Sequence, residues 1–474
     1  MCGITGVYRL DGEPVSLPLL KQMAGVIAHR GPDSEGFYID GNMGLGHRRL
    51  AIIDLSPLGN QPMANETGDI VLIYNGELFN YQELRVRLQA AGHRFRSNSD
   101  TEVIIHAYEE WGDACVERFN GQFAFVIWDA PRRRLFIARD RFGIKPFYYY
   151  HDGAKFVFGS EIKAILEHPN IPREVCYPAL NQYFTFQNIL TDLTLFEGIR
   201  LLPAGCTMVV TEDGITQRRY WDYCFEPQPT PMSEDEATEQ LFHLFKQAVT
   251  RQLMSDVPLA SYLSGGMDSG SVAAVTREQI GRIHTFTCGF DLSSASGLEL
   301  GFDERARAEV MANRLKTEHY EVVLHAGDME NVMPELIWHL EDLRVGQCYP
   351  NYYVSRLASK FVKVVLSGAG GDELFAGYPW RYYRGLDSHD AHSYSRSYYD
   401  FWQRLVPEEE KAQLFNGDIY KHVAPNSTFD VFRDIITQSG MALDTPESIV
   451  NASLYFELKT FLHGLLVVED KLSM

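Results

Sequence analysis

The chain has few cysteines and no long hydrophobic run. Its seven cysteines are scattered over 474 residues without a Cys-x-x-Cys pair, which suits neither a disulfide framework nor a structural zinc site. No apolar stretch approaches the roughly 20 residues that span a bilayer, and residues 1–6 lack the basic and apolar regions of a signal peptide. We therefore expect a soluble, cytoplasmic protein with no membrane partner.

Positive charge and metal-ligand patterns are also scarce. Only 43 Lys and Arg residues stand against 63 Asp and Glu residues, so the formal net charge is −20. Such a chain lacks the general attraction to phosphate backbones that dominates nucleic-acid affinity, so we expect no nucleic-acid partner. The histidines show no paired ligand spacing, and the sequence therefore predicts no zinc site.

The chain does have the size and composition of a folded multidomain protein. With 45% hydrophobic and 12% aromatic residues, its length allows two or three domains of roughly 150 residues each. Short β-type runs alternate with turns over the first 220 residues. The predicted strands are residues 4–10, 43–54, 70–74, 124–128, 134–139 and 155–159, and the predicted helices are residues 17–29 and 81–92. This pattern predicts an α+β domain of stacked antiparallel sheets at residues 1–222.

A change of pattern marks the predicted domain boundary. Three prolines within residues 226–232 interrupt regular structure, and Ser233 followed by acidic residues is a favourable helix start. We therefore assign residues 223–236 as a linker. Beyond it, predicted helices at 237–255, 271–281 and 303–315 alternate with predicted strands at 258–263, 284–290 and 363–366. The alternation predicts an α/β domain with a mainly parallel sheet at residues 237–474.

Cys2 is a candidate nucleophile. Because the initiator methionine is removed before small residues, we expect a thiol beside a free α-amine. An α-amine with a pKa of about 8 can take the proton of that thiol, so one residue would supply both nucleophile and base. A lone cysteine at this position is more often inert, and the interpretation therefore depends on the rest of the domain.

Further motifs in the first domain point the same way. Arg49 in His-Arg-Arg-Leu, the pair Asn75-Gly76 and Asp100 in Ser-Asn-Ser-Asp are expected at strand ends or turns. With residues 29–33 (His-Arg-Gly-Pro-Asp) and 139–146 (Arg-Asp-Arg-Phe-Gly-Ile-Lys-Pro), they resemble the class II glutamine amidotransferase domain, an N-terminal-nucleophile hydrolase. The resemblance implies that Cys2 attacks the glutamine carboxamide and that Asn75 and Gly76 form the oxyanion hole. It also implies that glutamine is held by Arg49, Asn75, Glu77 and Asp100. A guanidinium suits the α-carboxylate of an amino acid, and a carboxylate suits its α-ammonium.

The second domain opens with a loop suited to phosphate. Residues 261–270 (Ser-Tyr-Leu-Ser-Gly-Gly-Met-Asp-Ser-Gly) follow a predicted buried strand and start a helix. Glycines let backbone amides approach an anion, and the helix dipole favours negative charge there. Asp268 makes sense beside phosphates if it binds Mg²⁺. The loop matches neither the Walker A nor the dinucleotide pattern; it resembles the loop of ATP pyrophosphatases, which form acyl-adenylates and release pyrophosphate.

A second loop, Ser367-Gly-Ala-Gly-Gly-Asp-Glu373, again follows a strand with small residues and ends with acids. With Lys471 in Glu-Asp-Lys-Leu-Ser-Met, it makes essentially the whole chain similar to the glutamine-hydrolysing asparagine synthetase family. The resemblance implies glutamine, ATP and a small carboxylate as substrates, Mg²⁺ at Asp268 and Asp372, and a catalytic Lys471 that neutralises phosphate charge. The implied ATP-binding residues are Leu263, Ser264, Gly265, Gly266, Asp268, Ser269, Cys288, Ser367 and Gly368.

One position departs from the family. Asparagine synthetases usually carry Glu in the second loop to handle ammonia at the acyl-adenylate, and this chain has Ala369. Either Asp372, Glu373 or another acid takes the proton, or the acceptor is not aspartate but a related carboxylate such as a sugar acid, a diaminopimelate-like acid or a secondary metabolite. A non-catalytic binding protein that keeps the fold, and a relative that uses an internal amine in place of ammonia, are the remaining alternatives.

The resemblance also bears on length and assembly. The family's synthetase domain continues past the segment that contains Lys471, so we expect the second domain to be incomplete at its C-terminus. A homodimer is left open.

Overall fold

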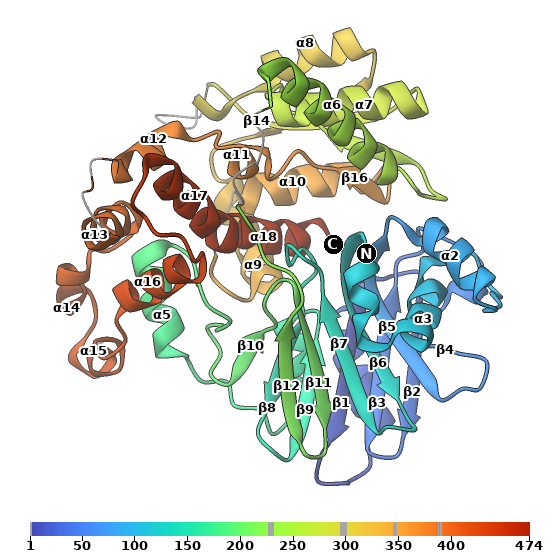
Figure 1. Ribbon diagram of the computed structural model, residues 1–474. Helices are drawn as coiled ribbons and strands as arrows, with labels where there is room; N and C mark the ends of the chain where they lie inside the picture. The colour runs from blue at the N-terminus through green and yellow to red at the C-terminus, as the bar shows by residue number, and fades with distance from the viewer. Residues whose placement is uncertain (1, 226–231, 294–300, 345–347, 387, 389–390) are drawn as a thin grey trace.

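The computed structural model describes residues 2–225, 232–293, 301–344, 348–386, 388 and 391–474 (Figure 1). The proline-containing residues 226–231 of the predicted linker lie outside this range. The helix start predicted at Ser233 is confirmed, because its side chain accepts from the backbone of Glu236 while Glu236 accepts from the backbone of Ser233. This capping box begins α6 (Glu234–Arg251).

Two six-stranded antiparallel sheets form the first half of the chain, as predicted. Their strand orders are β10-β8-β9-β1-β3-β2 and β12-β11-β7-β6-β5-β4. The first sheet contains β1 (Gly3–Arg9), β2 (Ser34–Asp40), β3 (Met43–Arg49), β8 (Tyr148–His151), β9 (Lys155–Gly159) and β10 (Ile199–Leu201). The second contains β4 (Met63–Ala64), β5 (Ile70–Leu78), β6 (Gly121–Asp129), β7 (Arg134–Arg139), β11 (Cys206–Thr211) and β12 (Gly214–Arg219). The predicted strand at residues 43–54 ends earlier, at Arg49.

The sheets are stacked because their strands are apolar on both faces. In β5, Val71 and Ile73 join the core between the two sheets, whereas Leu72 and Tyr74 pack under the helices on the other side. This is the alternation that the pleat of a strand requires. The outer layers are helical, since Leu20 of α1 packs with strand residues of the first sheet. The half therefore has four layers, helix, sheet, sheet and helix.

The helices of this half are more numerous than predicted. They are α1 (Leu17–Gly25), α2 (Tyr81–Ala90), α3 (Asp100–Trp111), α4 (Ile162–Leu166) and α5 (Tyr177–Phe186). The sequence predicted only the first two, and the first ends sooner than expected. Asp100, expected at a strand end or turn, is the first residue of α3, and Ser99 caps that helix by accepting from the backbone of Thr101.

A four-stranded parallel sheet lies at the centre of the second half, as predicted. Its order is β15-β14-β13-β16, with β13 (Leu259–Tyr262), β14 (His284–Phe290), β15 (Glu318–Leu324) and β16 (Val364–Leu366). The strand β15 was not predicted. Helix α6 precedes the sheet, and further helices connect its strands: α7 (Met267–Ile280), α8 (Arg305–Leu315), α9 (Asp328–Leu340) and α10 (Cys348–Ala358).

The remaining chain is helical and packs around aromatic side chains. Its helices are α11 (Gly371–Leu374), α12 (Pro379–Tyr382), α13 (Ala391–Trp402), α14 (Lys411–Leu414), α15 (Gly417–Val423), α16 (Thr428–Gln438), α17 (Pro446–Glu457) and α18 (His463–Ser473). Tyr398, Trp402, Phe432 and Phe456 share one buried cluster with Phe186 of α5, so this region packs against the first half. No helix in the described ranges has the length and apolarity to cross a bilayer.

Candidate active sites and the contact between them

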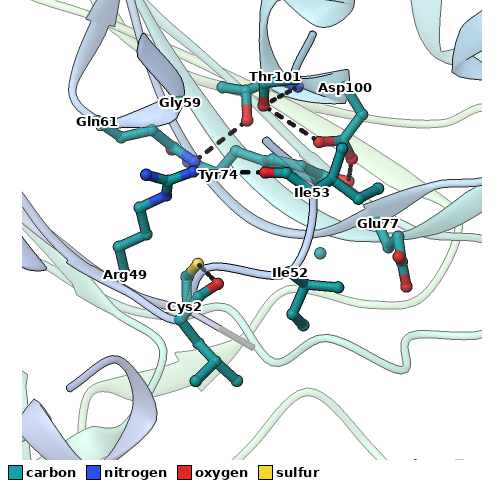
Figure 2. Close-up of a pocket in the computed structure, with 13 residues that line it drawn as sticks. Cys2, Arg49, Ile52, Ile53, Gly59, Gln61, Tyr74, Glu77, Asp100 and Thr101 are labelled. Atoms are coloured by element: carbon teal, nitrogen blue, oxygen red, sulfur yellow. Dashed lines mark hydrogen bonds between the residues drawn. The ribbon is translucent and has the colours of Figure 1, made fainter. Parts of the chain in front are cut away.

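A small pocket in the first half gathers most of the residues predicted to handle glutamine. Cys2, Arg49, Gly76, Glu77 and Asp100 all line it (Figure 2). They come from the residue before β1, the end of β3, the C-terminal part of β5 and the first turn of α3. Segments that are far apart in sequence therefore meet at one place, which is the arrangement expected of a functional site.

The thiol of Cys2 is buried at this pocket. Its Sγ lies 3.9 Å from the carbonyl oxygen of Leu50, and burial raises the pKa of the thiol. A raised pKa keeps the sulfur protonated, so a base beside it is needed to generate the thiolate.

Arg49 is held rigidly by the loop that follows β3. Its guanidinium donates to the carbonyls of Ser56 (3.0 Å) and Asp54 (2.5 Å) and to the side chain of Asn60 (2.8 Å). A Cβ on Gly59 would lie 2.2 Å from Arg49 Nη2, so glycine is required at that position. The guanidinium is thus fixed in place as a cationic wall of the pocket.

Asn75 and Gly76 are consecutive residues of β5. Gly76 lines the pocket together with Cys2, whereas Asn75 is not among the lining residues. The Asn75 side chain is fully buried, and neither its Nδ2 nor its Oδ1 has a hydrogen-bond partner among the described residues. An unpaired buried amide is costly and uncommon, which fits a group whose partner is a ligand. At Gly76, an added Cβ would lie 2.1 Å from the carbonyl oxygen of Gln122, so the backbone of Gly76 is closely packed.

Two buried carboxyl groups complete the pocket. Asp100 accepts from the Tyr74 hydroxyl (2.9 Å) and the Leu78 amide (3.0 Å), and burial raises its pKa. Burial, reinforced by the nearby Asp100, also raises the pKa of Glu77 to about 8. Glu77 Oε1 has no partner among the described residues. A positive group that comes close to either carboxyl would favour its charged form, so both can bind a cationic group.

Sequence reasoning missed part of the pocket wall. Gln61 and Thr101 also line the pocket, and they bond to each other at 3.3 Å. Gln61 Oε1 accepts from the Tyr74 amide at 2.6 Å, which ties the loop after β3 to β5. Neither residue lies in a recognisable motif, although Thr101 directly follows the predicted Asp100.

In the second half, the two predicted nucleotide loops lie at the carboxyl edge of the parallel sheet. The first loop is closed by its serines, since the Ser264 and Ser269 hydroxyls lie 2.9 Å apart and Ser269 Oγ also accepts from the Ser264 amide. A Cβ on Gly265 would lie 2.5 Å from Arg307 Cβ, and Gly265 has a φ of +78°. Glycine is therefore needed for the turn into α7.

The two loops touch each other. A Cβ on Gly368 would lie 2.6 Å from the backbone nitrogen of Ser269, and one on Gly371 would lie 2.2 Å from Asp268 Oδ2. Asp268 thus lies against the second loop, where burial and the charge of Asp372 raise its pKa. Carboxylates that repel each other in this way fit a divalent cation with oxygen ligands.

Other predicted nucleotide residues lie nearby or are already engaged. Leu263 and Cys288 lie at neighbouring positions of the sheet edge, and burial raises the pKa of the Cys288 thiol to about 12. Lys471 is different, because its Nζ is buried and bonds to the Leu340 carbonyl (2.7 Å) and to Glu341 (2.8 Å). The structure does not bring Lys471 together with the phosphate loops in this conformation.

A third acid reaches the second loop from α18. Glu469 Oε1 accepts from the Ser367 hydroxyl at 2.6 Å, and Ser367 Oγ in turn accepts from the Ala369 amide at 3.2 Å. Burial raises the pKa of Glu469. A carboxyl from α18 therefore contacts the loop in which position 369 carries Ala.

Buried ion pairs join the two halves next to Cys2. Arg30 donates to the Cys2 carbonyl (3.2 Å), to Glu161 (3.0 Å) and to Asp470 of α18 (2.7 Å). Lys145 also bonds to Asp470, at 3.0 Å. Burial opposes ionisation of Asp470, but Arg30 and Lys145 hold its pKa below the usual value. The guanidinium of Arg30 thus connects the backbone of Cys2 to α18, the helix that carries Glu469. Both chain ends lie in this region in Figure 1.

Two family models match the chain, one in each half. The family model described as "Glutamine amidotransferase domain" matches residues 1–221, and the model described as "Asparagine synthase" matches residues 240–474. The chain is 33% identical to asparagine synthetase [glutamine-hydrolyzing] 1 of Bacillus subtilis (strain 168), over 100% of this chain and 78% of that protein. It is 36% identical to a putative asparagine synthetase [glutamine-hydrolyzing] 2 of Methanocaldococcus jannaschii, over 80% of this chain and 76% of that protein.

The similarity to a third relative covers less of its length. Asparagine synthetase [glutamine-hydrolyzing] 3 of Bacillus subtilis (strain 168) is 36% identical over 82% of this chain, and the match spans 65% of that protein.

Proposed function

The chain belongs to the family of glutamine-hydrolysing asparagine synthetases, and on that basis we propose that it transfers the amide nitrogen of glutamine to a carboxylate at the expense of ATP. The observation that carries the proposal is the single buried pocket where Cys2 meets Arg49, Gly76, Glu77 and Asp100. Two sites would work in sequence. The first hydrolyses glutamine to glutamate and ammonia, and the second activates the carboxylate as an acyl-adenylate, releasing pyrophosphate, before ammonia displaces AMP.

In the first site, the thiolate of Cys2 attacks the carboxamide carbon of glutamine. The α-amine freed by removal of the preceding methionine takes the thiol proton and passes it to the departing ammonia. The unpartnered amide of Asn75 and the backbone amide of Gly76 stabilise the tetrahedral oxyanion. Water then releases glutamate from the thioester. Arg49 attracts the substrate's α-carboxylate, while Asp100 and Glu77 attract its α-ammonium.

In the second site, the backbone amides of Ser264 to Ser269 hold the phosphates of ATP at the N-terminus of α7. The carboxylates of Asp268 and Asp372 would bind Mg²⁺, whose charge offsets their mutual repulsion and that of the phosphates. Bound there, Mg²⁺ supplies electrostatic stabilisation to the leaving pyrophosphate. Lys471 would contribute to this only after leaving Glu341.

The amide-forming step needs an acid near the acyl group, and Glu469 is our candidate. Its carboxyl accepts from the Ser367 hydroxyl, and the oxygen of that hydroxyl accepts from the amide of Ala369, the position where the family usually has Glu. Because burial raises its pKa, Glu469 can hold or accept the proton that ammonia loses on attack. Glu373 is the second candidate; its carboxyl is also buried with a raised pKa, but it is bonded to the Tyr378 hydroxyl at 3.1 Å.

The acceptor is aspartate or a related carboxylate. Ala369 leaves more room than Glu at the acyl site, which favours an acceptor larger than aspartate as the second candidate. The cytoplasmic location expected from the sequence stays a prediction, and the homodimer stays open.

The test is a reconstitution with the full chain. It is incubated with Mg²⁺, ATP, glutamine and a panel of carboxylates that starts with aspartate, while pyrophosphate and glutamate release are followed. We expect pyrophosphate release to depend on one carboxylate and to match amide formation. The matched control is Cys2→Ala, which should lose amide formation from glutamine but keep it with ammonium chloride. Glutamine hydrolysis that survives Cys2→Ala unchanged would overturn the assignment of the nucleophile.

A further inference from the structure

Three side chains with metal-ligand atoms converge in the first half of the chain, outside the set of residues that line the Cys2 pocket. His106 and Glu109 come from α3, three residues apart and on one face of the helix, and His93 comes from the turn after α2. His93 Nδ1 lies 3.1 Å from His106 Nδ1, and Glu109 Oε2 lies 3.0 Å from His106 Nδ1 and 3.7 Å from His93 Nδ1. Thirteen positions separate the histidines, which is why no ligand spacing is visible in the sequence.

The triangle formed by these atoms has the size of one face of a zinc coordination sphere. A tetrahedral zinc ion with ligands at about 2.0–2.1 Å separates them by about 3.3 Å. The three observed distances of 3.0, 3.1 and 3.7 Å average close to that separation. A point about 2 Å from all three atoms therefore exists, close to the plane that they define.

The second nitrogen of each imidazole faces acidic groups. His93 Nε2 lies 3.3 Å from Glu110, and His106 Nε2 lies 3.9 Å from both Glu102 and Glu66. Glu110 can hold the proton of His93 on Nε2 and leave its Nδ1 free for a metal, as is usual around zinc-bound histidines. His106 Nε2 has no hydrogen-bond partner among the described residues, and its two acidic neighbours act on it only through their charge. Four carboxylates around two imidazoles also give the cluster a negative charge that a divalent cation would balance.

A metal can reach the cluster from solvent. The side chains of His93 and Glu109 remain 16% and 25% exposed, whereas that of His106 is 2% exposed. An open groove lined by Glu66 and His93 runs beside them. The groove supplies an entry path and a position for water as the fourth ligand.

We propose that His93, His106 and Glu109 bind one Zn²⁺ ion, with water completing a tetrahedral site. The ion would fasten the segment after α2 to α3. That segment leads to the glutamine pocket, because Glu102 accepts from the amides of Arg96 and Ser97 (2.8 Å each), two residues from Asp100. This proposal does not depend on the proposed amide-transfer function, and each can be tested without the other.

The rival interpretation is a proton-linked cluster, in which His106 Nδ1–H is shared between Glu109 and His93. Calorimetry with zinc chloride on the EDTA-treated full chain distinguishes the two. We expect one tight site, which His93→Ala and Glu109→Gln each weaken by about 10- to 100-fold or more, the range set by the loss of even outer-shell partners. The control His325→Ala, at an exposed histidine 62% open to solvent in the other half, should leave affinity unchanged.

Cobalt substitution makes the test specific for these ligands. Co²⁺ in a site with two imidazoles and a carboxylate gives intense visible bands without the near-ultraviolet thiolate band that binding at Cys2 would give. Because His93 and Glu109 are partly exposed, both variants should keep their fold, which circular dichroism checks, and their glutaminase activity in EDTA. Absence of zinc binding, unchanged affinity in both variants, or a thiolate band would overturn the proposal.

Discussion

Replacing Asn75 separates its proposed catalytic role from a structural one. Its side-chain Nδ2 and Oδ1 are buried without partners among the described residues. Each buried, unpaired polar group destabilises the folded state by about 1–3 kcal/mol. Asn75→Ala removes this destabilising amide, while it also opens a small cavity. We expect the free energy of unfolding to stay unchanged or to rise by about 1–2 kcal/mol. Loss of an oxyanion donor should lower glutaminase kcat by about 10²–10³-fold, equivalent to about 2.7–4 kcal/mol.

The assay measures both quantities on one preparation. Glutamate release is followed with a coupled dehydrogenase, and stability is followed by thermal and urea unfolding. Asn75→Asp keeps the size of the side chain but removes its donor, so its kcat should fall as far. Asn80→Ala is the control with the opposite expected result. Asn80 bonds to Arg118 and Asn120 at 2.9 Å each, so its replacement should lower the free energy of unfolding and leave glutaminase kcat unchanged. If Asn75→Ala behaves like Asn80→Ala, the oxyanion assignment is wrong.

Three further predictions concern the ion pairs and acids. Asp470→Asn removes the carboxylate that Lys145 contacts and leaves Arg30 with Glu161 alone of its two acids. It should lower the free energy of unfolding by about 3 kcal/mol or more and reduce glutamate release; an unchanged melting temperature would contradict this. Burial raises the pKa of Glu77 from 4.5 to about 8, so the folded state retains a proton that the unfolded state loses, and stability should fall as pH rises from 4.5 to 8. In Glu77→Gln, the melting temperature should vary less with pH between 4.5 and 8. If it falls with pH as steeply as in the wild type, Glu77 is not the group responsible. Asp372→Asn should abolish carboxylate-dependent pyrophosphate release yet preserve glutamine hydrolysis, and equal loss of both would point to misfolding.

Local patterns in the sequence predicted the elements that have a clear period or a clear start. The strands at residues 134–139, 155–159 and 284–290 end where predicted, because alternating or continuous apolar runs bounded by turns define them. Helix α3 was missed because residues Asp100 to Tyr108 are all buried, the polar ones among them included. The polar residues of this stretch therefore do not mark a solvent-facing side, and the sequence shows no amphipathic period. Its start was signalled by Ser99 followed by Glu102, a pattern typical of a helix N-terminus.

Contacts between distant segments could not be predicted in the same way. The pocket residues Arg49, Gly76 and Asp100 were predicted because each lies in a recognisable motif. Gln61 lies in none, and its place at the pocket became visible only in the structure, where it bonds to the Tyr74 backbone. The engagement of Lys471 with Glu341 likewise depends on how α18 packs, 130 positions away from its partner. Sequence shows which charges exist, and the fold decides which of them meet.

The joint at Arg30 has a consequence for synthesis on the ribosome. Domains generally fold in the order in which they emerge, so the two stacked sheets would form while α18 is still untranslated. Arg30 then holds the Cys2 carbonyl without its second acid, because Asp470 follows 440 positions later. We therefore expect the position of Cys2 to become fixed only after α18 has been synthesised and has packed against the first half.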